Sequence, residues 1–100
     1  MIIVAGAIEI DPADGPELEA AFDRMRTDTL AEEGCLFYEA YLGRTGAGTF
    51  FIFEKWRTPE ELTAHFQTSH MAKFGAVLGG VGVRSMDVRK YEVSAEGEVP

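Results

Sequence analysis

Cysteine, basic residues and long apolar runs are all scarce in this chain of 100 residues. Cys35 is the one cysteine, which excludes an internal disulfide and fits a protein of the reducing cytoplasm. No apolar run approaches the ~20 residues that a membrane span requires. The first apolar residues follow no basic segment, so we expect a strand there and not a signal peptide.

Acidic residues outnumber basic residues by about two to one. Nine Lys and Arg residues stand against 17 Asp and Glu, which gives a formal net charge of −8 and a pI near 4.6. Phosphate binding needs a basic surface, so we expect no nucleic-acid partner. The hydrophobic share of 46% is ordinary for a folded chain. We expect one domain at residues 1–93, followed by an acidic tail at residues 94–100.

The central feature of the sequence is residues 50–70, FFIFEKWRTPEELTAHFQTSH, which hold the only tryptophan and both histidines. They indicate a strand, a sharp turn and an amphipathic helix. Side chains of a strand alternate between its two faces. The alternation separates two sets: Phe50, Ile52, Glu54 and Trp56 on one face, and Phe51, Phe53 and Lys55 on the other. Because both faces carry large apolar groups, we expect both to be covered.

The helix begins directly after this strand. Thr58 suits the N-cap, Pro59 suits the first helical position, and Glu61 completes a capping box. The next side chains at helical spacing form one stripe: Leu62, His65, Phe66 and Ser69.

That stripe brings an imidazole towards a carboxylate. If it packs on the Trp56 face of the strand, His65 approaches Glu54. A carboxylate beside an imidazole fixes its tautomer and raises its proton affinity. The pair is either a structural hydrogen bond between strand and helix or a catalytic pair, because buried ionisable pairs serve both purposes.

The other elements complete a familiar order. In a first strand at residues 1–10, Gly6 indicates close approach of a ligand or another backbone, or room for a bulky neighbour such as Trp56. The remaining elements are a helix from Pro16 to about residue 33 before Gly34, a strand at 35–42, a short helix capped by Ser69 that ends at Gly79-Gly80, and a strand at 81–93. The order β-α-β-β-α-(α)-β predicts an α+β fold, the ferredoxin-like split βαβ antiparallel sheet with its helices on one face.

The sheet face without helices is expected to be apolar. Phe51 and Phe53 would lie there, with either Phe37 and Tyr41 or the alternate set of that strand, Leu36, Tyr38 and Leu42. Such a surface is too large to leave in water. We therefore predict a two-fold homodimer in which two sheets pack face to face.

Three segments together resemble a known family. EEGCLFYEAY (residues 32–41), FEKW (53–56) and LTAHFQTSHMAKF (62–74) are similar, in their order and spacing, to the antibiotic biosynthesis monooxygenase domain, and most of all to its small quinol-monooxygenase-like members. The resemblance implies a dimeric α/β barrel with a pocket between helices and sheet. It also implies oxygenation of a quinol- or anthrone-like aromatic by O2 without a flavin, haem or metal cofactor.

The resemblance carries over to some residues only. Trp56 matches the pocket tryptophan of polyketide-tailoring members, but those carry an asparagine where this chain has Ile52. Haem-degrading members use an asparagine in the first strand, where this chain reads Ala-Gly-Ala at residues 5–7, so the resemblance argues against haem. Glu54, His65 and His70 match the quinol-type pattern.

The leading hypothesis is thus a cytoplasmic monooxygenase of a small aromatic substrate. His65 held by Glu54 would be catalytic. The expected substrate contacts are Trp56, His70, Phe66 and Ile52, and we expect a cavity bounded by Trp56, His65 and Glu54. No metal set is predicted, because Cys35 lies on another strand and has no second cysteine. The alternatives are a non-catalytic ligand-binding barrel and an isomerase of a small hydroxy-carbonyl compound, which would use the same imidazole without O2.

Overall fold

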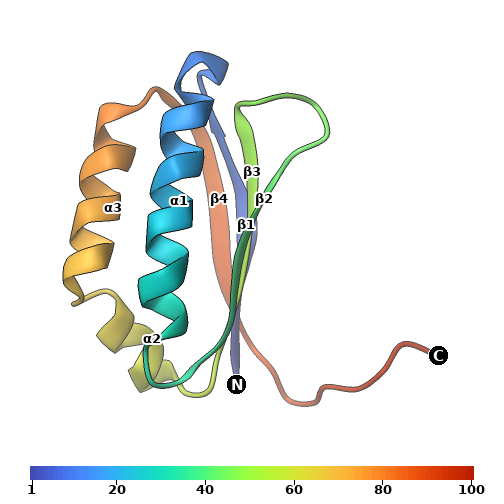
Figure 1. Ribbon diagram of the computed structural model, residues 1–100. Coiled ribbons are helices and arrows are strands. Elements are labelled where there is room, and N and C mark those ends of the chain that lie inside the picture. Colours follow the sequence, from blue (N-terminus) through green and yellow to red (C-terminus); the bar gives the residue numbers. More distant parts are fainter.

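The computed structural model describes residues 1–100 and has two layers, a four-stranded sheet and a layer of helices on one of its faces (Figure 1). The strands are β1 (Ile2–Ile10), β2 (Cys35–Leu42), β3 (Thr49–Trp56) and β4 (Val83–Glu92). The helices are η1 (Pro12–Asp14), α1 (Gly15–Leu30), α2 (Pro59–His65) and α3 (Ser69–Gly80). The sheet order is β2-β3-β1-β4, and all neighbours are antiparallel. The predicted ferredoxin-like α+β fold is confirmed.

Helix caps decide where the two histidines lie. The Thr58 hydroxyl accepts a hydrogen bond from the Glu61 backbone N–H at 3.2 Å, which confirms the expected start of α2. The expected cap at Ser69 is wrong, because the Thr68 hydroxyl accepts from the backbone N–H at the start of α3. The chain breaks between these helices, so His65 ends α2 and His70 lies in the first turn of α3.

Two element ends differ from expectation. α1 ends at Leu30 and not near residue 33, and Gly34 then turns the chain with φ +88°, a value that favours glycine. The last strand is β4 at 83–92 and not 81–93. The tail beyond it runs away from the helix layer, and its Glu96 forms an ion pair with Lys55 of β3 at 2.7 Å (Figure 1).

Gly6 lies in the middle of β1, between β3 and β4. A Cβ atom at this position would lie 2.0 Å from the carbonyl oxygen of Asp87 and 2.5 Å from the Cα atom of Val88, both in the β4 backbone. The close neighbour is therefore another backbone, as one of the sequence interpretations held, and not the side chain of Trp56.

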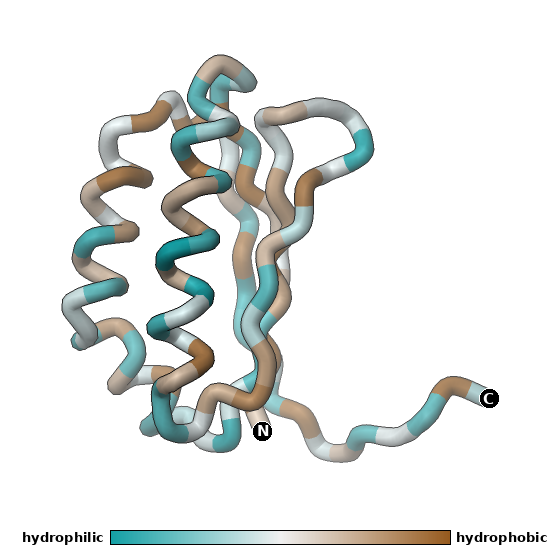
Figure 2. Tube along the Cα trace, in the orientation of Figure 1, coloured by the Kyte–Doolittle hydropathy of each residue, from teal (hydrophilic) through white to brown (hydrophobic).

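The space between helices and sheet contains two separate apolar clusters. Hydrophobic and hydrophilic residues are interleaved along the helices and strands that surround it (Figure 2). The larger cluster contains eleven buried residues: Ile8, Ile10, Leu18, Ala21, Phe22, Met25, Tyr38, Phe50, Ile52, Phe74 and Val81. The smaller contains only Ile2, Trp56 and Leu62. β1 and β3 contribute to both, with Ile8 opposite Phe50 in the larger and Ile2 opposite Trp56 in the smaller. The two clusters therefore occupy opposite ends of the layer.

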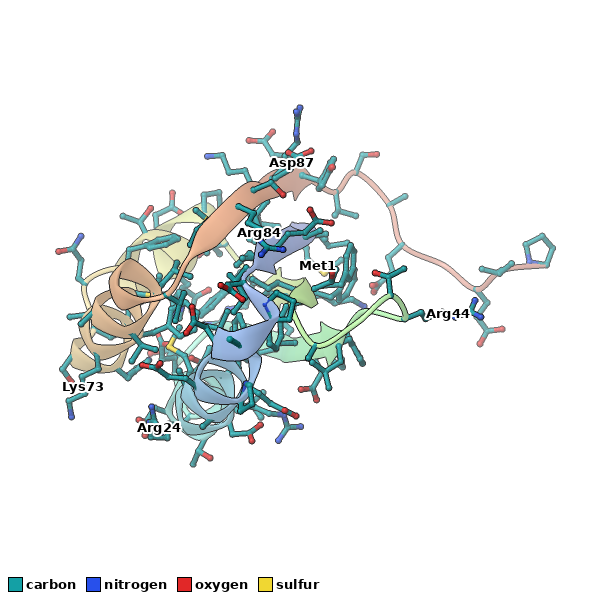
Figure 3. The ribbon with its side chains drawn as sticks, turned by 90° about the horizontal axis from the view of Figure 1, so that it is seen from above. Met1, Arg24, Arg44, Lys73, Arg84 and Asp87 are labelled. Carbon is teal, nitrogen blue, oxygen red and sulfur yellow. The ribbon has the colours of Figure 1, made fainter.

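The opposite face of the sheet carries no helix (Figures 1 and 3). Phe37 and Tyr41 lie on it with Phe51, which is 44% exposed, whereas Tyr38 is buried on the helix side. Asp87 and Arg84 of β4 lie on the side of the molecule away from Arg24 and Lys73 of the helices (Figure 3). Of the two sets considered for β2, Phe37 and Tyr41 face outward, and the pairing of two such faces stays a prediction. None of the helices has the length and apolar character of a membrane span.

Candidate functional site

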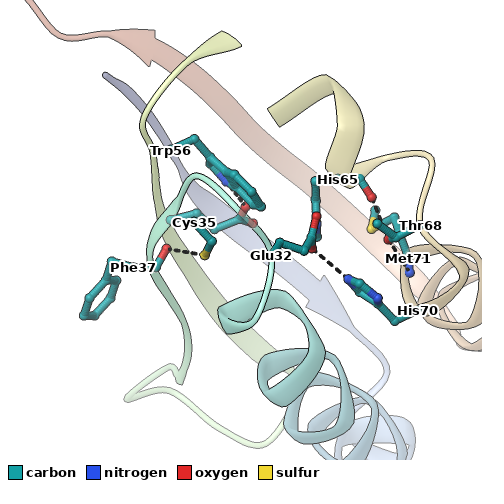
Figure 4. A network of polar contacts seen from close by, with 9 residues as sticks. Glu32, Cys35, Phe37, Trp56, His65, Thr68, His70 and Met71 are labelled. Carbon is teal, nitrogen blue, oxygen red and sulfur yellow. Dashed lines mark hydrogen bonds and ion pairs between the residues drawn. The ribbon is translucent and has the colours of Figure 1, made fainter. Parts of the chain in front are cut away.

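The site is built around Glu32, which follows α1 and accepts hydrogen bonds from both histidines (Figure 4). Nδ1 of His65 lies 2.6 Å from Oε2 of Glu32, and Nε2 of His70 lies 2.7 Å from the same oxygen. Such short contacts are typical of charge-assisted hydrogen bonds. One carboxylate oxygen therefore joins the ends of three helices.

His65 is the most buried member of this group. Its side chain is 2% exposed, and its ring lies 4.8 Å from that of Trp56 and 5.5 Å from that of Phe66, centroid to centroid. Because Nδ1–H donates to Glu32, the lone pair of the neutral ring lies on Nε2. Nε2 has no hydrogen-bond partner within the chain, so it can accept a proton or a hydrogen bond from a ligand.

Glu54 has a different partner from the one expected. The indole Nε1–H of Trp56 donates to Oε1 of Glu54 at 2.9 Å, since the two side chains share one face of β3 two residues apart. The expected hydrogen bond between Glu54 and His65 is wrong, because Glu32 takes that place. Burial raises the pKa of Glu54, while the Trp56 hydrogen bond and the nearby His65 lower it and the charge of Glu32 raises it.

Sequence reasoning missed Glu32, although it begins one of the segments that carry the family resemblance. Two adjacent glutamates precede Gly34, and they point in different directions: the Glu32 side chain is 14% exposed and that of Glu33 is 89% exposed. The signal available was their position just before a glycine of positive φ, where the chain turns back towards the sheet. That signal does not tell which of the two carboxylates turns inward.

The pKa values of Cys35 and Tyr38 show how the surroundings of the cluster treat a negative charge. Burial raises the pKa of the Cys35 thiol to about 11, with smaller contributions from the negative charges of Glu54 and Glu32. Burial likewise raises the pKa of Tyr38, with a smaller contribution from Glu54. This part of the molecule disfavours a new negative charge.

The expected cavity is closed. None of the five main cavities, of about 50 to 380 Å³, is lined by Trp56, His65 or Glu54, and the Trp56 side chain contacts both of the others. The cavity of about 380 Å³ lies between α1 and α3 and reaches the cluster at His70. A cavity of about 160 Å³ beside α2 is lined by Phe66.

The expected site residues therefore divide into two groups. His65, His70, Trp56 and Phe66 lie around one cluster, with Glu54 attached through its bond to the indole. Ile52 does not join them, because it is buried in the larger apolar cluster.

The cluster offers a metal-type ligand set as well as acid–base groups. The ligand atoms of Glu32, His65 and His70 all lie within 4.8 Å of one another. Imidazole and carboxylate groups are ligands of zinc and related ions.

Comparison with known proteins bears on the same residues. The sequence model of a family described as antibiotic biosynthesis monooxygenase matches residues 1–77 of this chain. This span includes Glu32, Glu54, Trp56, His65 and His70.

Individual relatives are similar over most of this chain. The chain is 34% identical over 71 residues to a Mycobacterium tuberculosis protein named "putative monooxygenase Rv0793", covering 71% of this chain and 69% of that one. The solved structure of Rv0793 superimposes with a TM-score of 0.87 at 28% identity, over 97% and 98% of the two chains. Identity to the uncharacterized Synechocystis protein sll1783 is 28% over 93 residues, which cover 93% of this chain but only 63% of that protein.

A second solved structure shows the fold alone. A "putative antibiotic biosynthesis monooxygenase" from Deinococcus radiodurans superimposes with a TM-score of 0.90 at 20% identity, over 100% of this chain and 99% of that one.

Proposed function

This chain belongs to the antibiotic biosynthesis monooxygenase family, and on that basis we propose that it oxidises a small quinol- or anthrone-like aromatic compound with O2, without a bound cofactor. The observation that carries the proposal is the buried ring of His65. Its Nδ1 is held by Glu32, its Nε2 has no hydrogen-bond partner within the chain, and the ring as a whole packs against that of Trp56.

His65 Nε2 would accept the proton of the substrate hydroxyl. The surroundings raise the pKa of Cys35 and Tyr38, so a bound phenol would also keep its proton unless a neighbouring base took it. Glu32 would stabilise the imidazolium that forms, and a positioned base of this kind contributes about 10²–10⁴-fold to the rate.

The substrate itself would supply the electrons. Its deprotonated, electron-rich ring passes an electron to O2 and then combines with the reduced oxygen. In an anthrone the reacting carbon gains one oxygen atom and loses two hydrogen atoms, which leave with the second oxygen atom as water. The protein would provide orientation, the base and exclusion of water.

We place the substrate entrance at Phe66. This side chain is exposed, lines the cavity of about 160 Å³ beside α2, and contacts the ring of His65 edge-on. Displacing it would open the cavity towards the ring of His65, which Phe66 contacts. His70 would then remain on the far side of Glu32, where it helps to orient the carboxylate.

The assembly we propose is a homodimer through the open face of the sheet. Phe37, Tyr41 and Phe51 expose large apolar side chains there, and β1 adds the small residues Ala5 and Ala7 between the strands. A second copy would remove this surface from water. Sedimentation velocity should show a dimer at micromolar protein and a shift to monomer for Phe51→Glu, and a wild type that sediments as a monomer would refute the proposal.

We also propose a cytoplasmic location, supported by the free thiol of Cys35. Cell fractionation tests this, and recovery of the protein from an oxidising compartment would contradict it.

The activity is tested by O2 consumption with anthrone and a series of hydroquinones, against the rate of autoxidation without protein. We expect His65→Ala to lower the enzymatic rate by about 10²–10⁴-fold and to leave the far-ultraviolet circular dichroism and the sedimentation unchanged. Glu32→Gln should also slow the reaction, whereas the exposed neighbour variant Glu33→Gln should not.

Two other outcomes would replace the proposal. Quenching of Trp56 fluorescence by these compounds without product would favour a ligand-binding protein. Turnover of a hydroxy-carbonyl compound under anaerobic conditions would favour an isomerase, because the same imidazole moves protons without O2.

A further inference from the structure

Glu32, His65 and His70 come from three separate parts of the chain, yet their ligand atoms lie within 4.8 Å of one another. Two imidazoles and one carboxylate form a ligand set that suits Zn²⁺, Co²⁺ and similar ions. Mg²⁺ and Ca²⁺ prefer oxygen ligands alone. The one thiol nearby, Cys35, is directed to the carbonyl oxygen of Phe37 at 3.7 Å.

We propose that Nδ1 of His65, Nε2 of His70 and the carboxylate of Glu32 bind one divalent transition-metal ion of the zinc type, with one coordination position left open.

The ligand atoms lie close enough to meet around one ion after an adjustment of their positions. Around a tetrahedral zinc ion, with bonds of about 2.0–2.1 Å, neighbouring ligand atoms lie roughly 3.3–3.4 Å apart. Oε2 of Glu32 lies 2.6 and 2.7 Å from the two nitrogens, the distances of hydrogen bonds. An incoming ion would replace the two bridging protons, which would pass to the other ring nitrogens, Nε2 of His65 and Nδ1 of His70, so that both imidazoles stay neutral. The carboxylate would have to move back by roughly 0.7 Å.

Glu32 is free to make that movement. It lies in the turn after α1, and both of its side-chain hydrogen bonds run through Oε2 to the two histidines, so Oε1 is not tied elsewhere. The histidines are held more firmly. His65 is packed against Trp56 at the end of α2, and His70 belongs to the first turn of α3.

The surroundings provide a path and room for a further ligand. His70 lines the cavity of about 380 Å³ between α1 and α3, so a hydrated ion can reach the cluster from that side. Water from this cavity would complete the coordination, as in sites with three protein ligands and one open position.

The inference goes beyond the proposed function and does not require it, because metal binding is measured without any organic substrate. If both hold, they compete. A metal ion at Nδ1 of His65 would take Glu32 away from its role beside the imidazolium, so the zinc-loaded protein would lose oxygenase activity and a chelator would restore it.

The test is a titration of untagged, chelator-treated protein with ZnCl2 by isothermal calorimetry and with CoCl2 by visible absorption. We expect one ion per chain, and d–d bands for Co²⁺ without a sulfur charge-transfer band. Glu32→Gln and His70→Ala should each weaken Zn²⁺ binding by more than about 100-fold, which is the upper end of the loss that substitution of an indirect ligand partner causes. Glu33→Gln is the matched control and should bind as the wild type does.

Nuclear magnetic resonance of the wild type keeps the test independent of variant folding. Co²⁺ should produce paramagnetically shifted imidazole resonances from both His65 and His70. Absence of saturable binding, binding that Glu32→Gln and His70→Ala leave unchanged, or imidazole resonances that Co²⁺ does not shift would each overturn the proposal.

Discussion

The two ends of the helix–sheet layer are built from the same strands but from different chemistry. At one end the ring of Phe22 lies 5.5 Å from that of Phe50 and 4.7 Å from that of Phe74, centroid to centroid, within a cluster of purely apolar contacts. At the other end Trp56, on the same face of β3 as Phe50, contacts His65 and donates to Glu54.

Because of this difference, one end contributes mainly to folding stability and the other mainly to the chemistry of the site. The apolar end buries most of the hydrophobic surface, which is the dominant favourable contribution to folding. The other end buries Glu54 and His65, and burial of ionisable groups opposes folding unless they are paired. We therefore expect substitutions at the first end to affect stability and those at the second to affect binding and reactivity more.

The largest expected effect is that of Phe50→Ala at the apolar end. The ring is buried against Phe22, so its removal leaves a cavity that costs about 3–5 kcal/mol of unfolding free energy. Urea denaturation followed by circular dichroism measures this. Phe66→Ala, an exposed ring at the other end, should stay within about 0.5 kcal/mol of the wild type. Equal losses for the two variants would contradict the separation.

A smaller loss is expected for Glu32→Ala. The substitution leaves the buried Nδ1–H of His65 without an acceptor and removes the link to His70, which costs about 1–3 kcal/mol. Urea denaturation in the presence of a chelator measures the loss of stability. Glu33→Ala serves as the control, with an expected change within about 0.5 kcal/mol. A neutral Glu32→Ala would show that the carboxylate does not hold the three helix ends together.

The sequence predicts the apolar end well because its signals are local. Alternation along β3 separates Phe50 and Ile52 from Phe51 without knowledge of any other element. The order of elements then leaves few ways to arrange the sheet.

The polar end is predictable only in part, because its contacts are set by how helix ends meet. His65 and Glu32 are separated by 33 positions, and their pairing depends on the angle at which α1 and α2 end. Strand alternation predicts Glu54 as the partner of His65 because both would lie on the Trp56 face, but the same alternation brings the Glu54 carboxylate to the indole N–H of Trp56. Sequence periodicity does not tell which of the two carboxylates, Glu32 or Glu54, accepts the hydrogen bond from His65.

Glu54→Gln should raise the free energy of unfolding, whereas the substitutions above lower it. Burial raises the pKa of Glu54, so the folded state binds more protons than the unfolded state between the two pKa values, and stability falls as pH rises through that range. The amide keeps an acceptor for the Trp56 indole and removes the charge. We expect higher stability than wild type at pH 7, by about 1.4 kcal/mol for each unit of pKa difference. Thermal melts at pH 7 and pH 4 measure this, and a gain that fails to shrink at the lower pH would contradict it.

Cys35 lies between the two ends and packs against both clusters. The reactivity of its thiol therefore reports how well the boundary between the clusters is shielded from water. With a pKa raised from 9.0 to about 11, the thiolate fraction at pH 7 falls about 100-fold. A thiolate of higher pKa is more nucleophilic, which recovers about tenfold. We expect the folded protein to react with iodoacetamide about tenfold more slowly than a peptide of residues 32–38, as followed by mass spectrometry.

Glu54→Gln tests the cause of this slow rate, because the charge of Glu54 adds to the effect of burial on the pKa of the thiol. Removing that charge should lower the pKa of Cys35 and raise the alkylation rate towards that of the peptide. Phe66→Ala, which leaves both carboxylates in place, should not change the rate. If instead the wild type and the peptide react equally fast, Cys35 is not shielded by either cluster, and the polar end is open to water in solution.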